Sequence, residues 1–510
     1  MKISKSGIFI LIGVVVFILL RIPSLYEPIW YGDEGIYASA AQEMSQGEVL
    51  YRDIWDNKPH GIYIIYIFFQ NNQFWIRAAS LMAGLAAIIG VYFLGKKLLG
   101  KKAGLLASFI SVFLIGSPLF EGNIANAENF FIAFNIWGFY LGYKYAKNKY
   151  LALITGVLFA CATWLKINAI TDFAGFIIFI LLTQTKLISK KPTLKDLSKI
   201  VFYLIGFIIP ITIASTIEIL NHNFDNFFNT VFLDMFRYVG YSKSSTFLFF
   251  EDGIRLKAVF TLIALFLLSF NYLKKNIGKA TLFIGLIFIF QYLGTIISSR
   301  HYSHYLLQAV TGFALLTCLF ARRIRRSSLT TKKINFIFVY LLIIISGLCY
   351  FTKGGGIGVN YGVAKLDGRN LGYKLYAYYE TFVNYKILNK ISINDYNYFF
   401  NDEETHMLTL KRTLNNEFTE ISKDSIYIYT DRGWTYPYLD IRIPTFYSTA
   451  YHTNLASDGS ERLIRELKEF DPKLIVMEQG IPSFEELDTL LSQRYQYVYE
   501  DNKYEYYEMR

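Results

Sequence analysis

Long apolar segments separated by short polar gaps run through the first 350 or so residues of the chain. A helix of about 20 apolar residues crosses the roughly 30 Å of bilayer hydrocarbon, so the pattern predicts about eleven membrane helices. The first has no small-residue cleavage site and is expected to be retained rather than removed as a signal peptide. The predicted helices are at residues 7–20, 75–95, 103–120, 130–146, 150–165, 168–187, 200–220, 254–273, 280–298, 304–321 and 334–351.

One of the gaps, at residues 26–74, is too long for a simple turn and has its own pattern. Within Gly32–Gly47, apolar residues recur at helical spacing against polar ones, which predicts a helix lying on the membrane surface and ended by Gly47. The stretch Gly61–Gln70 is apolar and aromatic but too short to span, so it too is expected in the interface.

The tail of the chain has a different pattern. Ser425–Thr430 and Lys473–Met477 are short apolar runs typical of buried strands, whereas Gly459–Phe470 and Pro482–Leu491 have helical patterns. The last two aromatic runs, 495–499 and 504–509, are spaced to pair as a hairpin. We therefore predict two domains: a membrane domain at 1–352 and, at 353–510, a small α/β extracytoplasmic domain that begins with helical linker material.

Composition supports a membrane protein and argues against a nucleic-acid partner. Hydrophobic residues make up 53% of the 510 positions and charged residues only 18%, with a mean hydropathy of +0.31. The net charge of +11 is unevenly distributed, because residues 355–510 carry −7 and the preceding part +18. Much of the positive excess lies in short gaps between apolar helices, where it indicates topology rather than a ligand.

Basic and acidic gaps alternate along the membrane part. Lysines and arginines cluster before the first helix, near 96–102, 144–149, 186–199, 274–279 and 322–333, and nearly every acid lies in the other gaps. Since positive loops stay in the cytoplasm, the N-terminus is expected inside and, after eleven crossings, the C-terminal domain outside. We expect a multi-pass protein of the cell membrane.

The first outer gap holds the densest set of reactive side chains. Asp33 and Glu34 are followed by Tyr37, and then by Asp56-Asn57-Lys58. A structural explanation is available, since Asp33 could cap a helix whose dipole also favours Glu34, and Lys58 could reach from an apolar segment to the interface. The combination of acids, an amide and a lysine in one membrane-face loop favours a functional site.

This loop resembles the first outer loop of the GT-C glycosyltransferases of the protein mannosyltransferase and aminoarabinose transferase type. His60 departs from the pattern, because these loops often carry a second proline or a small residue there. The resemblance extends at low density to the whole chain, through Ala125–Phe130, Trp164–Lys166, Arg300–Gln308, Asp431–Tyr438 and Pro472–Val476.

The resemblance implies inverting transfer of a sugar from a polyprenyl-phosphate lipid to an acceptor glycan, lipid or protein. Such a donor needs a carboxylate to take the acceptor's proton and cations to bind the phosphate. We expect Asp33 to be the base, Glu34 to position the acceptor or the base, and Glu128 to be a second candidate base. Lys58 is the first choice for the phosphate. The helpers expected around them are Lys166, Arg300, His304 and Tyr305 for the donor, and Tyr37, Asp56 and Asn57 for the acceptor or the loop.

One alternative function and the question of a metal stay open at this point. A transporter or flippase for lipid-linked sugars would use the same lipid, but it calls for ionisable groups at mid-membrane depth and often for repeated halves. Only Asp172 and Glu218 are acids embedded in the predicted helices, and no internal repeat is evident. No compact metal-ligand spacing is present, so no cofactor is required, while a divalent metal remains open.

Overall fold

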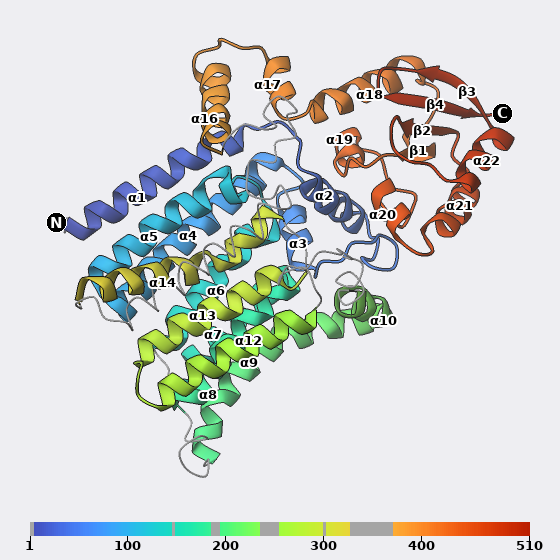
Figure 1. Cartoon of the computed structure of the whole chain (residues 1–510). Coiled ribbons are helices and arrows are strands. Elements are labelled where there is room, and N and C mark those ends of the chain that lie inside the picture. Colours follow the sequence, from blue (N-terminus) through green and yellow to red (C-terminus); the bar gives the residue numbers. More distant parts are fainter. Residues whose placement is uncertain (1–4, 145–147, 185–193, 235–253, 299–301, 327–370) are drawn as a thin grey trace.

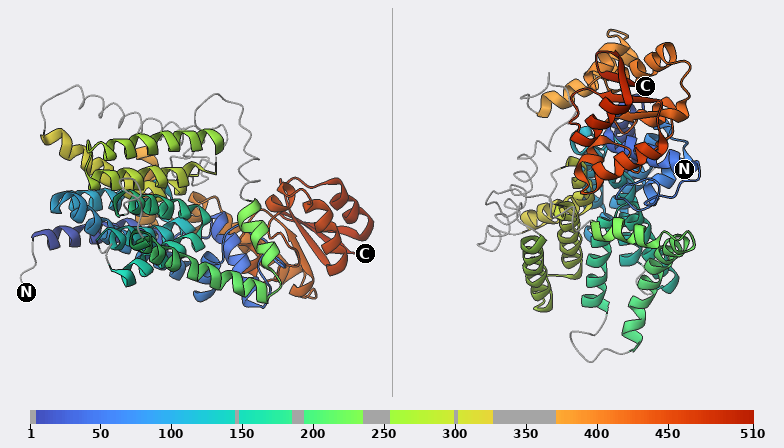
Figure 2. Two further views of the ribbon diagram at one scale, coloured as in Figure 1. Left: turned by 90° about the horizontal axis from the view of Figure 1, so that it is seen from below. Right: turned by 90° about the vertical axis from the view of Figure 1, so that its right-hand side faces the viewer.

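The computed structural model describes residues 5–144, 148–184, 194–234, 254–298, 302–326 and 371–510. Helices form an elongated bundle, and a smaller domain containing the sheet sits at one end of it (Figure 1). Figure 2 shows the same arrangement from two further directions. The predicted fold class, a polytopic helical bundle followed by a small α/β domain, is confirmed.

Ten of the eleven predicted membrane helices fall on described residues, and all ten are helices; the eleventh, at 334–351, lies outside them. Among the described residues, five helices are long and apolar enough to cross a membrane by themselves. The ten are α1 (Lys5–Arg21), α4 (Gln73–Leu99), α5 (Lys101–Gly116), α6 (Ala127–Lys144), α7 (Lys149–Leu165), α8 (Ile170–Gln184), α9 (Leu194–Leu220), α12 (Ile254–Leu273), α13 (Lys279–Ile296) and α14 (Leu306–Arg326).

Glycines let neighbouring membrane helices approach closely. A methyl group added at Gly156 of α7 would lie 2.2 Å from the carbonyl oxygen of Tyr203 in α9. Likewise, a methyl group added at Gly206 of α9 would lie 2.0 Å from the carbonyl oxygen of Leu153 in α7. Helices in lipid associate through this kind of backbone contact, since they gain little from burying apolar side chains.

The basic turns gather at one end of the bundle. The turns between α4 and α5 and between α12 and α13 lie at the end away from the sheet domain (Figure 1). The short connecting elements at the other end are η1 (Ile22–Leu25), η2 (Pro118–Phe120), η3 (Ile167–Ala169), α10 (Phe224–Phe228), η4 (Asn229–Leu233) and η5 (Ser303–Tyr305). Two ends of opposite character follow from the alternating charge pattern of the sequence.

Both helices predicted in the first long gap are present, as α2 (Gly32–Ser45) and α3 (Gly61–Phe68). Helix α2 is more enclosed than its pattern suggests, because Glu34, Tyr37 and Ala38 on one turn and Ala41 on the next are all buried; its position at the membrane surface stays a prediction. Of its polar positions, Gln42 and Glu43 contact the C-terminal domain and Glu34 contacts Arg77 of α4. In α3, Ile62, Tyr63 and Tyr66 are likewise buried.

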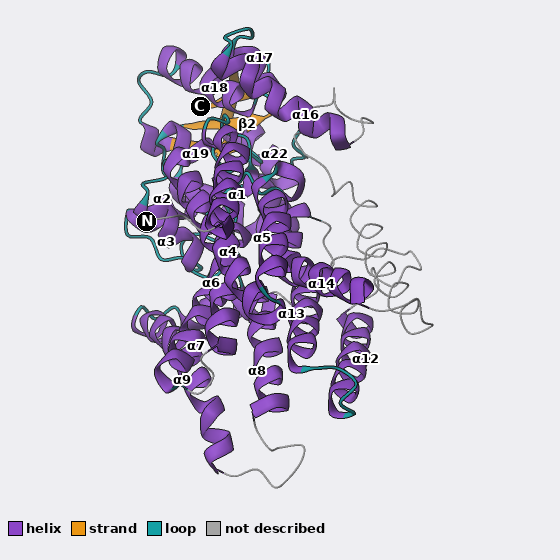
Figure 3. Ribbon diagram, turned by 90° about the vertical axis from the view of Figure 1, so that its left-hand side faces the viewer, coloured by secondary structure: helices purple, strands orange, loops and turns teal. Residues whose placement is uncertain are grey.

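The tail begins with helices and ends in a sheet (Figure 3). Its described helical elements are α16 (Leu371–Phe382), η7 (Val383–Ile387), α17 (Ile393–Phe399), α18 (Glu403–Glu417), η8 (Lys423–Ser425), α19 (Thr435–Leu439), α20 (Ala450–Leu455), α21 (Gly459–Phe470) and α22 (Glu485–Arg494). The predicted boundary at 352 falls outside the described residues and stays a prediction. Helix α22 starts three residues later than predicted because Phe484 is extended and three acids, favourable for a helix dipole, fill the first turn.

The four strands are β1 (Ile426–Tyr429), β2 (Leu474–Glu478), β3 (Tyr495–Glu500) and β4 (Tyr504–Met509), in the order β1-β2-β4-β3. Strands β1 and β2 are parallel and fully buried, as their uninterrupted apolar runs predict. Strands β3 and β4 form the predicted antiparallel hairpin.

The C-terminal domain packs directly on α2. A methyl group on Gly35 would lie 2.3 Å from the backbone nitrogen of Trp434, so the two backbones touch. Ser39 donates to the carbonyl of Gly433 at 2.8 Å, and Glu43 accepts from the backbone nitrogen of Ile443 at 3.0 Å. Helix α2 is therefore held between the membrane helices and the C-terminal domain.

Candidate active site at the junction of the two domains

Asp33 lies in the first turn of α2. The N-cap of this helix is Tyr31 and makes no side-chain capping bond, so the alternative that Asp33 caps the helix is wrong. The Asp33 carboxylate instead accepts from Nδ2 of Asn126, just before α6, at 3.1 Å. Asn126 also contacts the hydroxyls of Tyr31 at 3.3 Å and Tyr37 at 2.8 Å. These bonds fix Asp33 from one side.

Lys58 reaches the same region from the loop that precedes α3. Its Nζ lies 3.4 Å from Oδ1 of buried Asp56 and 5.5 Å from the centre of the Tyr37 ring. Tyr51 donates to the Lys58 carbonyl at 2.6 Å, which fixes the backbone. The second oxygen of Asp56, Oδ2, is buried and has no hydrogen-bond partner among the described residues.

Lys166 enters at the end of α7. It forms an ion pair with Glu128, in the first turn of α6, and its Nζ lies 4.1 Å from the centre of the Tyr305 ring. Glu128 is completely buried, and its Oε2 has no hydrogen-bond partner within the described part of the chain. Two buried carboxylates, Asp56 and Glu128, thus each hold a lysine through one oxygen only.

His304 belongs to η5, before α14, and is buried against Glu121. Its Nδ1 lies 2.6 Å from Glu121 Oε2 and 3.2 Å from the hydroxyl of Tyr31. Ser303 donates to the other Glu121 oxygen at 2.7 Å. Through Tyr31 and Asn126, this cluster joins the one that holds Asp33.

The electrostatic balance at Asp33 reflects this convergence. Burial raises the pKa of the Asp33 carboxyl. The electrostatic effects of Lys58, His304 and Lys166 and the Asn126 hydrogen bond lower it by more, so the net pKa lies below the ordinary value. Burial also lowers the pKa of Lys166, against the opposing effect of Glu128. An ionised carboxylate surrounded by cations suits a site that binds an anion beside a base.

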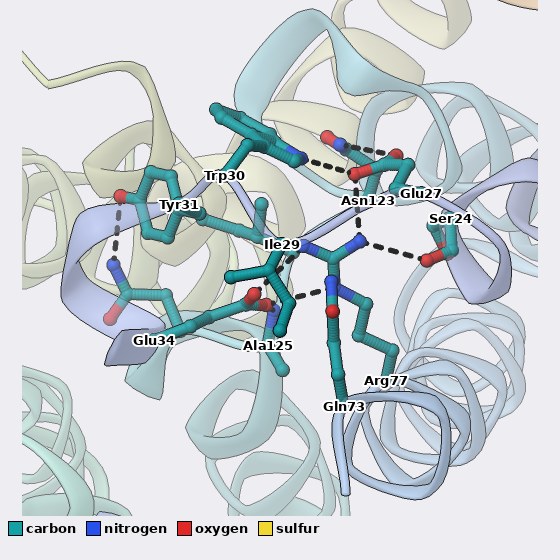
Figure 4. Close-up of polar contacts among 12 residues, drawn as sticks. Ser24, Glu27, Ile29, Trp30, Tyr31, Glu34, Gln73, Arg77, Asn123 and Ala125 are labelled. Carbon is teal, nitrogen blue, oxygen red and sulfur yellow. Dashed lines mark hydrogen bonds and ion pairs between the residues drawn. The ribbon is translucent and has the colours of Figure 1, made fainter. Parts of the chain in front are cut away.

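Glu34 points away from this group and into a buried ion cluster. Arg77 of α4 donates to both of its oxygens and also to Glu27 Oε2 at 2.8 Å (Figure 4). The backbone nitrogen of Ala125 donates to Glu34 Oε1 at 2.6 Å. Arg77 and Glu34 are no more than 1% exposed, so the cluster anchors α2 on the membrane helices.

Residues far apart in the sequence therefore meet around Asp33: Lys58, Lys166, His304 and Tyr305, with Tyr37, Asp56 and Glu128 behind them. Arg300 lies outside the described residues. The side chain of His60 contacts Glu218 at 2.9 Å, at the end of α9. No group of three or more potential metal ligands is found within the described ranges.

Several members of the site were not singled out from the sequence: Asn126, Glu121, Tyr31, Glu27 and Arg77. Arg77 carried a usable signal, because an arginine within an apolar membrane segment needs an acidic partner. Asn126 lies within the segment Ala125–Phe130 that carries the family resemblance, but no neighbouring residue indicates which carboxylate it contacts.

Known proteins resemble this chain in one stretch of its sequence and in its fold. Residues 59–213 match the family model of dolichyl-phosphate-mannose-protein mannosyltransferases. No curated protein matches the chain. The crystal structure of ArnT from Cupriavidus metallidurans bound to undecaprenyl phosphate superposes with a TM-score of 0.56 at 13% identity, covering 99% of this chain and 98% of that one.

Two further solved structures extend the comparison. The apo ArnT of the same organism gives a TM-score of 0.54 at 12% identity, covering 98% and 97% of the two chains. The archaeal oligosaccharyltransferase AglB from Archaeoglobus fulgidus, in complex with an inhibitory peptide and a dolichol-phosphate, is more loosely alike. Its TM-score is 0.45 at 10% identity, with 93% of this chain and 69% of that chain covered.

Proposed function

We propose that this chain, an ArnT-like membrane protein of the GT-C superfamily, transfers a sugar from a polyprenyl-phosphate lipid to an acceptor. One observation carries the proposal: two lysines, Lys58 and Lys166, and the imidazole of His304 come from separate elements and act on the single carboxylate of Asp33. A lipid phosphate bound among these cations would bring the anomeric carbon of its sugar next to a base.

The reaction is a single displacement. Asp33 accepts the proton of the acceptor's hydroxyl or amine as its oxygen or nitrogen attacks the anomeric carbon. The bond between that carbon and the phosphate oxygen breaks, and polyprenyl phosphate leaves with the electron pair. Attack from the face opposite the leaving group inverts the anomeric configuration. No acid need protonate the leaving group, since a phosphate oxygen is already a stable anion.

The cations have complementary roles in this mechanism. Lys58 binds the phosphate and stabilises the negative charge that builds up on it in the transition state. Lys166 is the second phosphate contact and is positioned by Glu128 and the Tyr305 ring. His304, held by Glu121, completes the positive side of the site. Arg300, four residues earlier, is expected to help at the same place.

The two other acids named with Asp33 take supporting roles. Glu34 is engaged on both oxygens by Arg77 and the backbone, so it positions the base through α2 instead of contacting the acceptor. Glu128 has one oxygen without a partner in the described part of the chain, which keeps it as the second candidate base. Tyr37, Asp56 and Asn57 support the loop that carries Lys58.

The site is expected at the outer face of the cell membrane, with the N-terminus in the cytoplasm. Basic turns gather at the bundle end away from α2, and positive loops stay inside. The expected partners are the lipid donor, an acceptor glycan, lipid or protein, and the bilayer. No cofactor is required by this mechanism.

Binding of undecaprenyl phosphate to the purified full-length protein tests the donor side. Lys58→Ala is expected to weaken binding by tenfold or more, since it removes a charge-assisted contact. Arg52→Ala is the matched control, because Arg52 is an exposed cation six residues earlier in the same loop. Equal binding by wild type and Lys58→Ala would refute the assignment of Lys58 to the phosphate.

A further inference from the structure

The C-terminal domain contacts the loop that carries Lys58 at an aromatic cluster around Trp55. The backbone nitrogen of Trp55 donates to the carbonyl of Phe446 at 2.9 Å. Its indole ring lies 4.9 Å from the ring of His452 and 5.5 Å from that of Tyr447. Because Trp55 directly precedes Asp56, the partner of Lys58, this aromatic group borders the candidate active site.

Local structure fixes His452 with one ring nitrogen engaged. Thr449 is the N-cap of α20, and its hydroxyl accepts from the backbone nitrogen of His452 and contacts Nδ1 at 3.0 Å. Nε2 of His452 and the indole N–H of Trp55 have no hydrogen-bond partner among the described residues. Trp55 and His452 are both half-buried. Two polar atoms with unused bonding capacity thus lie on an aromatic wall.

The charges of the site extend to this wall. Burial lowers the pKa of His452 to about 4, and Asp56, Lys58 and Asp33 each act on it electrostatically. The imidazole is therefore neutral near pH 7, and can accept or donate a hydrogen bond without adding charge. A neutral polar group among aromatic rings suits an uncharged, hydroxyl-rich ligand better than it suits a phosphate.

We propose that Trp55, Tyr447 and His452 form a sugar-binding subsite, shared by the first outer loop and the C-terminal domain, for the sugar ring of the lipid donor. This inference rests on the proposed function, since it takes Lys58 as the phosphate contact. A sugar has C–H groups that pack on aromatic rings and hydroxyls that bond to polar atoms at their edge. The C-terminal domain thereby takes part in choosing the sugar.

The test compares two ligands of the full-length protein: undecaprenyl phosphate, and a panel of undecaprenyl phosphates carrying mannose, glucose, galactose or 4-aminoarabinose. Wild type is expected to bind at least one sugar-bearing lipid more tightly than the bare lipid. His452→Ala is expected to remove about tenfold of that preference, the loss expected for about one hydrogen bond, and to leave binding of the bare lipid unchanged. Lys58→Ala is expected to weaken binding of both the bare and the sugar-bearing lipids.

Two variants separate a binding role from a structural one. Asparagine at 452 places its amide near the Nδ1 position and keeps the Thr449 contact, whereas glutamine reaches the Nε2 position. His452→Gln is therefore expected to keep more of the sugar preference than His452→Asn. Leu455→Ala, at a 54% exposed position in the same helix, is the control and is expected to behave like wild type.

The outcomes are distinct. If wild type binds a sugar-bearing lipid no better than the bare lipid, or if His452→Ala keeps the preference, the subsite is refuted while the proposed function stands. If His452→Ala changes only the KM for the acceptor, the wall binds the acceptor and the assignment to the donor is wrong. If wild type binds no lipid of the panel, bare or glycosylated, the proposed function itself fails and the subsite with it.

Discussion

Arg77 of α4 holds Glu34 of α2 by two parallel hydrogen bonds, Nε to Oε1 at 3.1 Å and Nη2 to Oε2 at 2.8 Å. Both side chains are buried, and Arg77 also binds Glu27 and the carbonyl of Ser24. Asp33 immediately precedes Glu34, so the position of the proposed base depends on this pair. Adjacent acids thus serve different purposes, one in the site and one in the scaffold beneath it.

The pair predicts a stability defect at Glu34. Glu34→Gln leaves Arg77 with an uncompensated share of its buried charge, which costs about 3 kcal/mol in comparable pairs. Thermal unfolding in detergent should therefore show a lowered Tm. Glu420→Gln, at an exposed acid of the C-terminal domain, should leave Tm unchanged. A Glu34→Gln protein as stable as wild type but inactive would instead indicate that Glu34 contacts substrate.

The contact between α2 and the C-terminal domain predicts a contrast between two glycines. Gly35→Ala places a methyl group 2.3 Å from the Trp434 backbone and must push the domains apart. Gly32→Ala, one turn earlier, meets nothing within 4 Å. Limited proteolysis should cut the Gly35→Ala protein faster and its transfer activity should fall, whereas Gly32→Ala stays close to wild type. Equal behaviour of the two variants would argue against a functional domain contact.

The electrostatics of Asp33 predict a pH shift. Because the folded-state pKa is lowered, the carboxylate stays ionised as pH falls past the ordinary value. Its contribution to stability is complete above the ordinary pKa and is lost as pH falls from there through the lowered one. Lys58→Gln removes the largest of the charges that lower the pKa. The acidic limb of the pH–rate profile should then move to higher pH, and Lys58→Arg should restore it in part. If the acidic limb of the profile does not move in Lys58→Gln, Lys58 does not lower the pKa of the base.

The Lys166–Glu128 pair predicts strong coupling. Lys166→Met alone leaves Glu128 buried without its cation, and Glu128→Gln alone leaves Lys166 without its anion. The double variant should be more stable than the sum of the single losses indicates, with a coupling energy of about 1–3 kcal/mol by double-mutant cycle. Activity of Glu128→Gln distinguishes the two candidate bases: it should exceed that of Asp33→Asn. The reverse order would make Glu128 the base.

Much of the architecture could be predicted from the sequence because bilayer thickness constrains helix length. Each described apolar segment became a helix, and the two buried strands and the hairpin formed where their patterns placed them. The burial of α2 against the C-terminal domain could not be predicted in the same way. Its polar positions looked solvated, but Ser39 and Glu43 bond to residues about 400 positions later, which no local pattern reports.

The residues of the site also fall into those that local sequence predicts and those that it does not. Asp33 and Lys58 could be singled out because chemistry-bearing residues were dense in one loop. Asn126 and Glu121 could not, since each acts through bonds to residues in distant elements. Glu34 shows the limit most clearly, because its neighbour in sequence faces the site while Glu34 faces Arg77, and only the tertiary structure separates the two.

The most direct test of the central claim is sugar release from a labelled polyprenyl-phosphate sugar by the Asp33→Asn protein, measured in single turnover. The account predicts correctly folded protein, as judged by Tm, and a rate at least about 100-fold below wild type, the usual effect of removing a general base. Asp225→Asn, an exposed acid in α10, should keep the wild-type rate. Release by Asp33→Asn at the wild-type rate would contradict the claim that Asp33 is the base.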